Sequence, residues 1–261
     1  MAGVVLVTGG SGYIAGFTIR QLIEQGWTVR ATIRNLNREA EVRDWLKVDN
    51  DRLSFFTADL TSDAGWTEAT AGCSHVVHMA SPVPMHAVKD ENEVIVPARD
   101  GALRAIRFAR DAGVTRLVMT SSVAAIFYGR AVGKDIFTEA DWTDVAAKDV
   151  SAYAKSKTIA ERAARDWIAA EGGSLEFVTV NPGMVMGPLL GTDFSPSLEV
   201  VKRVLEGTYP ALPDLGFNLV DVRDVADLHV RALSAPDISG ERFMAVAPRG
   251  FLRLMEIAAI L

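Results

Sequence analysis

Short apolar runs alternate along the chain with longer segments that have the period of a helix, and this alternation limits the possible folds more than any other feature. The runs expected as strands are residues 4–8, 27–33, 53–57, 75–79, 117–120 and 177–180, and the segments expected as helices are 14–25, 38–48, 98–112 and 152–170. Runs that are apolar throughout are typical of strands covered on both faces. The sequence therefore predicts an α/β fold built on a doubly wound parallel sheet.

After Asn181 the alternation gives way to loops rich in glycine and proline, with further helical segments at 198–206 and 222–233. In an open α/β sheet the ligand binds beyond the carboxyl ends of the strands, so this last part is expected to cover that crevice. We expect a core at residues 1–182 and a small C-terminal substrate lobe, interleaved with the core, at residues 183–261.

Charge and composition exclude several classes of partner. The net charge is −6 and no lysine and arginine cluster is present, which argues against a nucleic-acid partner. The single cysteine, Cys73, suits a small buried residue in a reducing compartment. No apolar stretch reaches the roughly 18 residues of a membrane span, and no signal peptide is recognisable. We expect a cytoplasmic monomer or homodimer without membrane partners.

The histidines give no sign of a metal site. His75 and His78 are three residues apart on an expected strand, so their side chains point to opposite faces and do not bind one metal together. His229 lies on an expected helix and is also interpreted as structural.

A glycine-rich sequence joins the first strand to the first helix and reads Thr8-Gly9-Gly10-Ser11-Gly12-Tyr13-Ile14-Ala15. Gly9 allows a tight turn, and Gly12 lets backbone N–H groups at the helix N-terminus approach a pyrophosphate. A turn without a ligand is the alternative. Because the motif lies at the first strand-to-helix junction, it favours a dinucleotide, which Tyr13 and Ile14 would also contact.

The end of the second strand indicates which dinucleotide. Proteins that bind NAD commonly carry an acidic residue there, whereas this chain has Arg34 and Asn35, followed by Arg38. A guanidinium binds a 2′-phosphate with two hydrogen bonds, so the pattern favours NADP(H), unless Arg34 is only a solvated surface residue. Asp59 and Leu60 are expected to flank the adenine, although Asp59 could equally cap the helix that follows.

Three side chains point to proton transfer at a carbonyl or alcohol. Tyr153 and Lys157 are four residues apart near the start of an expected helix and so share one face. The pKa of an ordinary tyrosine, about 10, is expected to be lowered here by Lys157, a nicotinamide charge and low dielectric acting jointly. Ser122 follows the strand at 117–120, where it could bond to the substrate oxygen or merely cap a turn.

Taken in order, the motifs resemble those of the extended short-chain dehydrogenases and reductases. They are the TGxxGxxA loop at 8–15, Ala80-Ser81-Pro82, Thr120-Ser121-Ser122, Tyr153-x-x-x-Lys157 and Asn181-Pro182-Gly183-Met184-Val185. Within that family the chain resembles the branch of dihydroflavonol reductases, cinnamoyl-CoA reductases and microbial NADPH-dependent ketone or aldehyde reductases. The resemblance spans almost the whole chain and implies a Rossmann core.

The resemblance also implies residue roles in NADP(H)-dependent reduction of a ketone or aldehyde. Tyr153 would protonate the carbonyl oxygen, Ser122 would polarise it, and Lys157 would bind the nicotinamide ribose. The remaining cofactor contacts would come from Ala80, Ser81, Pro182, Gly183, Val185 and Ser197. Two positions depart from the family pattern: the third glycine is Ala15, and a lysine of the plant enzymes is replaced by Glu41, so Arg38 would supply any second phosphate contact.

Large apolar side chains in the last third of the chain predict a small apolar carbonyl or alcohol as substrate. They are Met184, Met186, Leu189, Leu190, Phe194, Leu212 and Phe217, of which Met184, Phe194 and Phe217 are the candidates for substrate contact, although each could belong to the core. Two other functions remain open: an NAD-dependent nucleotide-sugar epimerase or dehydratase, and a non-catalytic NADP-sensing regulator.

The C-terminus carries apolar residues at helical spacing from Phe251 to Leu261 without a stop signal. This pattern predicts a longer protein, with an end that is frayed or leaves an apolar patch exposed. The alternative is a short natural chain that buries the stripe against its own core or a second subunit.

Overall fold

Seven parallel strands form the central sheet of the computed structural model, which describes residues 3–48, 50–83, 88–129, 136–192, 195–248 and 250–261. The strand order is β3-β2-β1-β4-β5-β6-β9, and each neighbouring pair is parallel. The strands are β1 (Val4–Thr8), β2 (Thr28–Ile33), β3 (Leu53–Thr57), β4 (His75–His78), β5 (Arg116–Thr120), β6 (Glu176–Pro182) and β9 (Arg242–Ala245). The predicted doubly wound sheet is confirmed, and its order reverses between β1 and β4.

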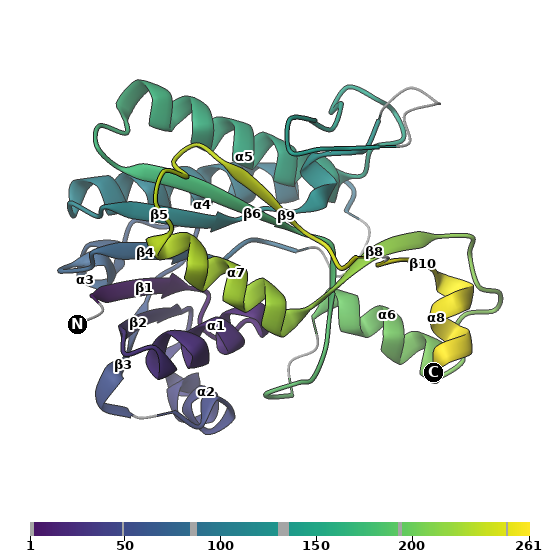
Figure 1. Ribbon diagram of the computed structural model, residues 1–261, viewed down its shortest axis with the longest axis horizontal. Coiled ribbons are helices and arrows are strands. Elements are labelled where there is room, and N and C mark those ends of the chain that lie inside the picture. Colours follow the sequence, from purple (N-terminus) through teal and green to yellow (C-terminus); the bar gives the residue numbers. More distant parts are fainter. Residues whose placement is uncertain (1–2, 49, 84–87, 130–135, 193–194, 249) are drawn as a thin grey trace.

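Helices cover both faces of this sheet (Figure 1). One layer contains α1 (Tyr13–Glu24), α2 (Glu39–Leu46) and α7 (Val222–Ser234), and the other contains α3 (Trp66–Thr70), α4 (Asn92–Asp111) and α5 (Ala152–Glu171). Successive residues of β1 point to opposite faces, so Val5 and Val7 join the core beneath α1 and α7, whereas Leu6 joins the core beneath α4 and α5. The apolar runs are therefore buried on both sides, as their composition predicts.

The remaining elements form a smaller lobe beside the carboxyl edge of the sheet, far from the N-terminus (Figure 1). A three-stranded sheet of order β10-β8-β7 combines β7 (Met184–Met186), β8 (Gly216–Asp221) and β10 (Phe251–Arg253). It is accompanied by α6 (Pro196–Leu205) and α8 (Leu254–Ile260). Between these elements the chain returns to the core to form α7 and β9, so core and lobe are interleaved.

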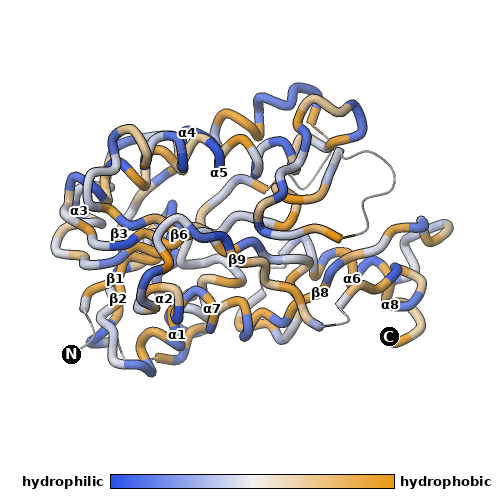
Figure 2. The backbone as a smooth tube through the Cα atoms, turned by 45° about the horizontal axis from the view of Figure 1, so that its top comes forward, coloured by the Kyte–Doolittle hydropathy of each residue, from blue (hydrophilic) through white to orange (hydrophobic). Residues whose placement is uncertain are grey.

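Among the helices the structure describes, none combines the length and apolar character needed to cross a membrane. Hydrophobic and hydrophilic residues alternate along the chain in these helices, as the colours in Figure 2 show for α4 and α5. Cys73 is buried, as predicted.

Helix α4 begins six residues earlier than the sequence predicts. It starts at Asn92 rather than Ala98 and contains Pro97. The Asp90 carboxylate accepts a hydrogen bond from the backbone N–H of Asn92 at 2.9 Å and so marks the start of the helix. Pro97 removes one backbone donor, which a helix of 20 residues tolerates.

The C-terminal apolar stripe is not one helix, and this prediction is wrong in part. Phe251 and Leu252 belong to strand β10, which pairs antiparallel with β8, and only the residues from Leu254 onward are helical. Leu254 and Ile257 are buried, whereas Met255 and Ile260 are exposed. The helix therefore buries one face and leaves apolar side chains on the other.

Gly65 offers a direct test of the packing around α3. It precedes the helix with a φ of +81°, and a Cβ there would lie 1.9 Å from the Thr57 carbonyl oxygen. Gly72, with a φ of +71°, has nothing within 4 Å of its would-be Cβ. Gly72→Ala should therefore cost only the backbone strain, about 1 to 2 kcal/mol of unfolding free energy.

Gly65→Ala should cost at least about 2 kcal/mol more than Gly72→Ala, because the backbone at Thr57 must also move. Urea unfolding followed by circular dichroism measures both variants. Equal losses in the two would show that Thr57 is not packed against Gly65.

Candidate active site

The glycine loop lies where β1 meets α1. Gly9 has a φ of +70°, and a Cβ there would lie 3.1 Å from the Cα of Ala80. The backbone N–H of Gly10 donates to the Thr32 carbonyl at 2.7 Å, and that of Gly12 donates to the Gly9 carbonyl at 2.8 Å. These bonds form the predicted tight turn and hold it against the end of β2, while Gly9 packs against Ala80, which follows β4.

The N-terminus of α1 is arranged to receive an anion. Helices α5, α6 and α7 have the N-cap residues Ser151, Ser195 and Asp221, whose side chains each accept a hydrogen bond from the first turn. The N-cap of helix α1 is Gly12, which has no side chain, and the first turn of α1 contains no acidic residue. Its first N–H groups and the positive end of its dipole are thus left for a ligand. The site fits a pyrophosphate.

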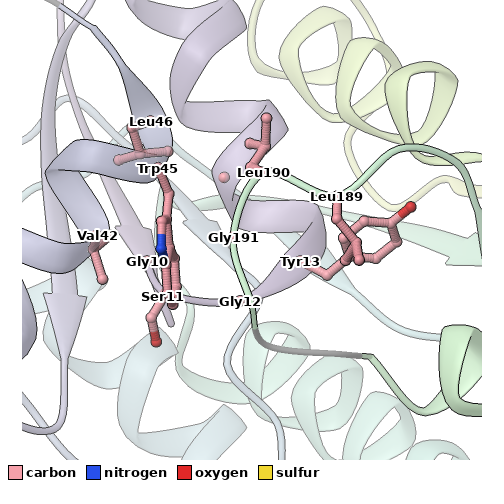
Figure 3. Close-up of a pocket in the computed structure, with 11 residues that line it drawn as sticks. Gly10, Ser11, Gly12, Tyr13, Val42, Trp45, Leu46, Leu189, Leu190 and Gly191 are labelled. Carbon is pink, nitrogen blue, oxygen red and sulfur yellow. The ribbon is translucent and has the colours of Figure 1, made fainter.

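A pocket opens directly over this loop (Figure 3). Figure 3 shows the Trp45 indole from α2 lying beside Ser11, with Leu190 opposite. Gly191 passes so close that a Cβ there would lie 2.2 Å from the Trp45 ring. The pocket is lined by Gly10, Ser11, Gly12, Tyr13, Gly16, Val42, Trp45, Leu46, Leu189, Leu190 and Gly191. The segment after β7 therefore covers the glycine loop.

Arg34 and Asp59 lie near the ends of β2 and β3. Arg34 is exposed directly after β2. Asp59 accepts hydrogen bonds from the hydroxyl and backbone N–H of Thr61, and these bonds, with a smaller contribution from Arg34, lower the pKa of its carboxyl group. Because α3 begins only at Trp66, Asp59 caps a turn and not the helix that follows. Leu60 comes next and is half-buried.

Arg38 already interacts with side chains of helix α2, which it precedes. Its guanidinium binds Glu41 at 2.8 Å and lies 5.2 Å from the ring centroid of Trp45. The Asn35 side chain accepts a hydrogen bond from the backbone N–H of Asn37 and begins a short 3-10 turn, Leu36–Arg38. A phosphate at Arg38 would have Glu41 as a competing anion.

Ser122, Tyr153 and Lys157 come together at the carboxyl edge of the sheet. The Ser122 hydroxyl accepts a hydrogen bond from the backbone N–H of Ala124 at 3.1 Å and is also hydrogen-bonded to the Tyr153 phenol. Lys157 lies one helical turn after Tyr153, with its Nζ 5.9 Å from the phenol ring centroid. The shared face expected from the four-residue spacing is confirmed.

Burial affects both titratable members of this group. It raises the pKa of Tyr153 above its ordinary value, and the hydrogen bond with Ser122 only partly opposes it. The expectation that low dielectric helps to lower this pKa is therefore wrong, because a buried site favours the neutral phenol. Burial also lowers the pKa of Lys157 to about 8, against the attraction of Glu161. At neutral pH the site holds a phenol and an ammonium.

His78 completes the floor of the site in a neutral form. The Thr8 hydroxyl accepts hydrogen bonds from the backbone N–H groups of Met79 and Ala80, both at 3.0 Å, so its own proton goes to Nδ1 of His78. Burial, with the nearby Lys157 charge, lowers the pKa of His78 to about 3. No cluster of metal-ligating residues occurs in the described part of the chain.

The other predicted contacts lie around the same edge. Ala80 and Ser81 follow β4, and Pro182, at the end of β6, accepts a hydrogen bond from Ser122 at 3.5 Å. A Cβ on Gly183 would lie 2.1 Å from the Asn218 carbonyl oxygen, so the backbone approaches β8 closely there. The Val185 side chain is part of the main core, and Val185 lies opposite Val220 in the pairing of β7 with β8.

The lobe residues predicted to contact ligands have different surroundings. Met184 is half-buried in β7, and Phe217 is half-buried in β8 opposite Leu252 of β10. Ser197 is the second residue of α6, a helix capped by Ser195. Phe194 lies outside the described residues.

Sequence reasoning missed Glu161, a fully buried carboxylate on α5. It follows Lys157 by one helical turn and binds Ser121, Asn181 and Arg242. The sequence did contain a signal for Glu161. It is an acidic residue four positions after Lys157, which places it on the face of α5 that meets the sheet.

A tyrosine and a lysine one turn apart, beside a serine at the carboxyl edge of a doubly wound sheet, define the short-chain dehydrogenase class. Residues 5–245 match the model of the NAD dependent epimerase/dehydratase family. The chain belongs to this family.

Its relatives include plant reductases. The chain is 37% identical to a cinnamoyl-CoA reductase of Medicago truncatula over 92% of its length and 75% of the relative. It is 33% identical to a dihydroflavonol 4-reductase of Hordeum vulgare over 91% of its length and 69% of the relative. The structure of Gre2 from Candida albicans in complex with NADPH is similar with a TM-score of 0.85 and 26% identity, over 96% of this chain and 79% of that one. The resemblance seen in the motifs is thereby confirmed.

His229 predicts a pH dependence of folding. Its ring binds the Thr120 hydroxyl and the Val225 carbonyl, each at 2.7 Å, and burial lowers its pKa to about 4. Because the unfolded chain binds this proton more readily, the stability that neutral His229 contributes is complete above about pH 6.5 and is lost as the pH falls toward 4.

Between pH 7.5 and pH 5 the unfolding free energy of the wild type should fall as the unfolded chain takes up a proton at His229, whereas His229→Gln has no such group. The fall in His229→Gln should therefore be smaller by about 1 to 2 kcal/mol. Urea unfolding at the two pH values measures this difference. His78 is present in both proteins and contributes equally. The same loss in wild type and variant would contradict a neutral, buried His229.

Proposed function

We propose that this protein reduces a small apolar ketone or aldehyde to the alcohol, reversibly, with NADPH as the source of hydride. The protein is an oxidoreductase acting on CH–OH and carbonyl groups, and its cofactor is NADP(H). The observation that carries the proposal is the position of the Tyr153 phenol beside Ser122, with Nζ of Lys157 5.9 Å from its ring centroid. Reductase relatives and a similar structure that binds NADPH support the same conclusion.

The backbone around the glycine loop would hold the cofactor. Uncapped N–H groups at Tyr13 and Ile14 would bind the pyrophosphate, with Gly9 and Gly12 giving the backbone room to approach. The segments after β4 and β6 would line the nicotinamide half, through Ala80, Ser81, Pro182, Gly183 and Val185, and Ser197 would reach a phosphate from α6.

NADPH would supply a hydride to the carbonyl carbon. The carbonyl π electrons then move to the oxygen, which takes the Tyr153 proton to give the alcohol. Ser122 would donate a hydrogen bond to that oxygen in place of its long bond to the Pro182 carbonyl. Lys157 would bind the nicotinamide ribose, and its ammonium would stabilise the phenolate that Tyr153 becomes.

Cofactor selection would depend on Arg34. Its guanidinium would bind the 2′-phosphate directly after β2, with Asn35 beside it, while Asp59 and Leu60 flank the adenine. Arg38 would make a second contact only in competition with Glu41.

We assign mainly substrate binding to the lobe at residues 183–261, which also supplies a few cofactor contacts, and dinucleotide binding to the core at residues 1–182. Met184 and Phe217, on the neighbouring strands β7 and β8, would contribute apolar contacts, together with Phe194. Few charges accompany them, so small charged keto acids would bind poorly.

Replacing Tyr153 with Phe removes the proton donor and keeps the ring. Turnover should fall at least about a hundredfold while NADPH still binds. Loss of NADPH absorbance measures turnover, and quenching of tryptophan fluorescence measures binding. Tyr128→Phe is the matched control, because this exposed tyrosine near Tyr153 undergoes the same chemical change. Near-normal turnover in Tyr153→Phe would exclude it as the acid.

Replacing Arg34 with Ala should raise the NADPH KM at least about tenfold and leave the NADH KM nearly unchanged, since a charge-assisted contact is worth about 1.5 to 3 kcal/mol. Glu41→Gln is a second variant that tests the phosphate contact of Arg38. It removes an anion from Arg38 and should lower the NADPH KM. Equal effects of Arg34→Ala on the two cofactors would contradict the assignment.

A further inference from the structure

Behind the catalytic group lies a buried cluster of charges centred on Glu161, which has no exposed surface. Its carboxylate accepts hydrogen bonds from Arg242 of β9 at 2.7 Å and from the Ser121 hydroxyl at 2.6 Å. Arg165, one turn further along α5, pairs with it at 3.2 Å. A buried carboxylate is costly unless it is paired, and these pairings offset the cost of burying the Glu161 charge.

Asn181 connects this cluster to Ser122. Its side-chain NH₂ group donates to Glu161 at 2.9 Å and to the Ser122 backbone carbonyl at 3.2 Å. Because both partners are acceptors, the amide has only this orientation, and its own oxygen is buried without a hydrogen-bond partner in the described part of the chain. An unsatisfied buried acceptor destabilises the fold. The arrangement is better explained by a need to fix Ser122 than by stability.

Glu161 also lies one turn beyond Lys157 on the same face of α5. Lys157 is buried, and among the described residues its ammonium makes no ion pair or hydrogen bond, whereas the Glu161 charge attracts it. The other titratable groups that face Lys157 are Tyr153 on α5 and His78 on β4, both neutral at pH 7. On the α4 side, Glu91 is paired with Lys155 at 2.8 Å.

We propose that Glu161 is a positioning residue of the active site, which holds the Ser122 backbone through Asn181 and supplies the negative charge that stabilises the Lys157 ammonium. The proposal rests on the proposed reductase function, in which Lys157 must be charged. Glu161 would touch neither substrate nor cofactor and would act through these two residues.

The charges around Glu161 allow a test in both directions. Glu161→Gln keeps the shape and removes the negative charge, so the alkaline limb of the kcat profile, set by Lys157, should move down by at least about half a pH unit. Arg165→Met removes a cation that partly neutralises Glu161, so the limb should move up. Arg165 is partly exposed, which makes its loss tolerable for folding if Glu161→Gln fails to fold.

Thr179→Val is the matched control. The Thr179 hydroxyl donates to Glu161 at 3.1 Å, so this variant weakens the same cluster without changing its charge. It should lower the melting temperature and leave the alkaline limb where the wild type has it. If Glu161 is purely structural, the alkaline limb of the kcat profile should stay at its wild-type pH in both Glu161→Gln and Arg165→Met. That result would overturn the proposal.

The pH dependence of NADPH affinity, measured by tryptophan fluorescence, provides a readout independent of turnover. Its alkaline limb should shift in the same two directions, because Lys157 would bind the nicotinamide ribose. If the variants show these shifts in NADPH affinity but the wild type reduces no carbonyl, the proposed function is contradicted and the role of Glu161 is supported. Active wild type with no shift in either variant would contradict the role of Glu161 alone.

Discussion

The hydroxyl of Thr8 links the ends of β1 and β4, at the place where the strand order reverses. It accepts the first two backbone N–H groups after β4 and donates to His78, so the loops leaving the two strands are fixed relative to each other. In a doubly wound sheet the crevice opens at this reversal. The glycine loop follows Thr8 directly, and Ser122, Tyr153 and Lys157 lie along the same edge of the sheet. The loop and these three residues therefore border one crevice.

The chemistry assigned to this crevice depends on burial more than on direct ion pairs. Low dielectric keeps the Tyr153 phenol protonated and lowers the pKa of the Lys157 ammonium to about 8. For carbonyl reduction a protonated tyrosine is the form that is needed, so the same burial that opposes a phenolate supports the acid role. Lys157 must then remain charged despite its burial, which is the role that we propose for the Glu161 carboxylate one turn away.

Much of the core was predictable from the sequence because its strands are apolar on both faces. The bounds of β1 and β3 are those expected, and so is the pairing of Tyr153 with Lys157, since both follow from local periodicity. The lobe strands β7, β8 and β10 were not predicted. They are short or half-buried, and β8 acquires its partners from segments about 30 residues away on either side in the sequence. Periodicity carries no information on such pairing.

The site was predicted in its residue types but not in its electrostatics. The position of Ser122 after β5 follows from the strand pattern, whereas the link from Ser122 through Asn181 to Glu161 joins three separate elements and needs the tertiary structure. The start of α4 was missed for a different reason. Proline is common at helix starts, so Pro97 suggested a later start, and Asp90, which binds the first N–H of α4, resembles an ordinary turn residue.

The most direct test of the account is the oxidation of NADPH by purified protein across a panel of carbonyl compounds, followed by the loss of NADPH absorbance. The account predicts that aryl and bulky aliphatic ketones or aldehydes give higher kcat/KM values than small charged keto acids, with NADPH preferred over NADH. Binding of NADPH without oxidation by any member of the panel would contradict it and favour a cofactor-sensing protein. Turnover of a sugar nucleotide with tightly bound NAD and no net cofactor oxidation would contradict it in favour of an epimerase.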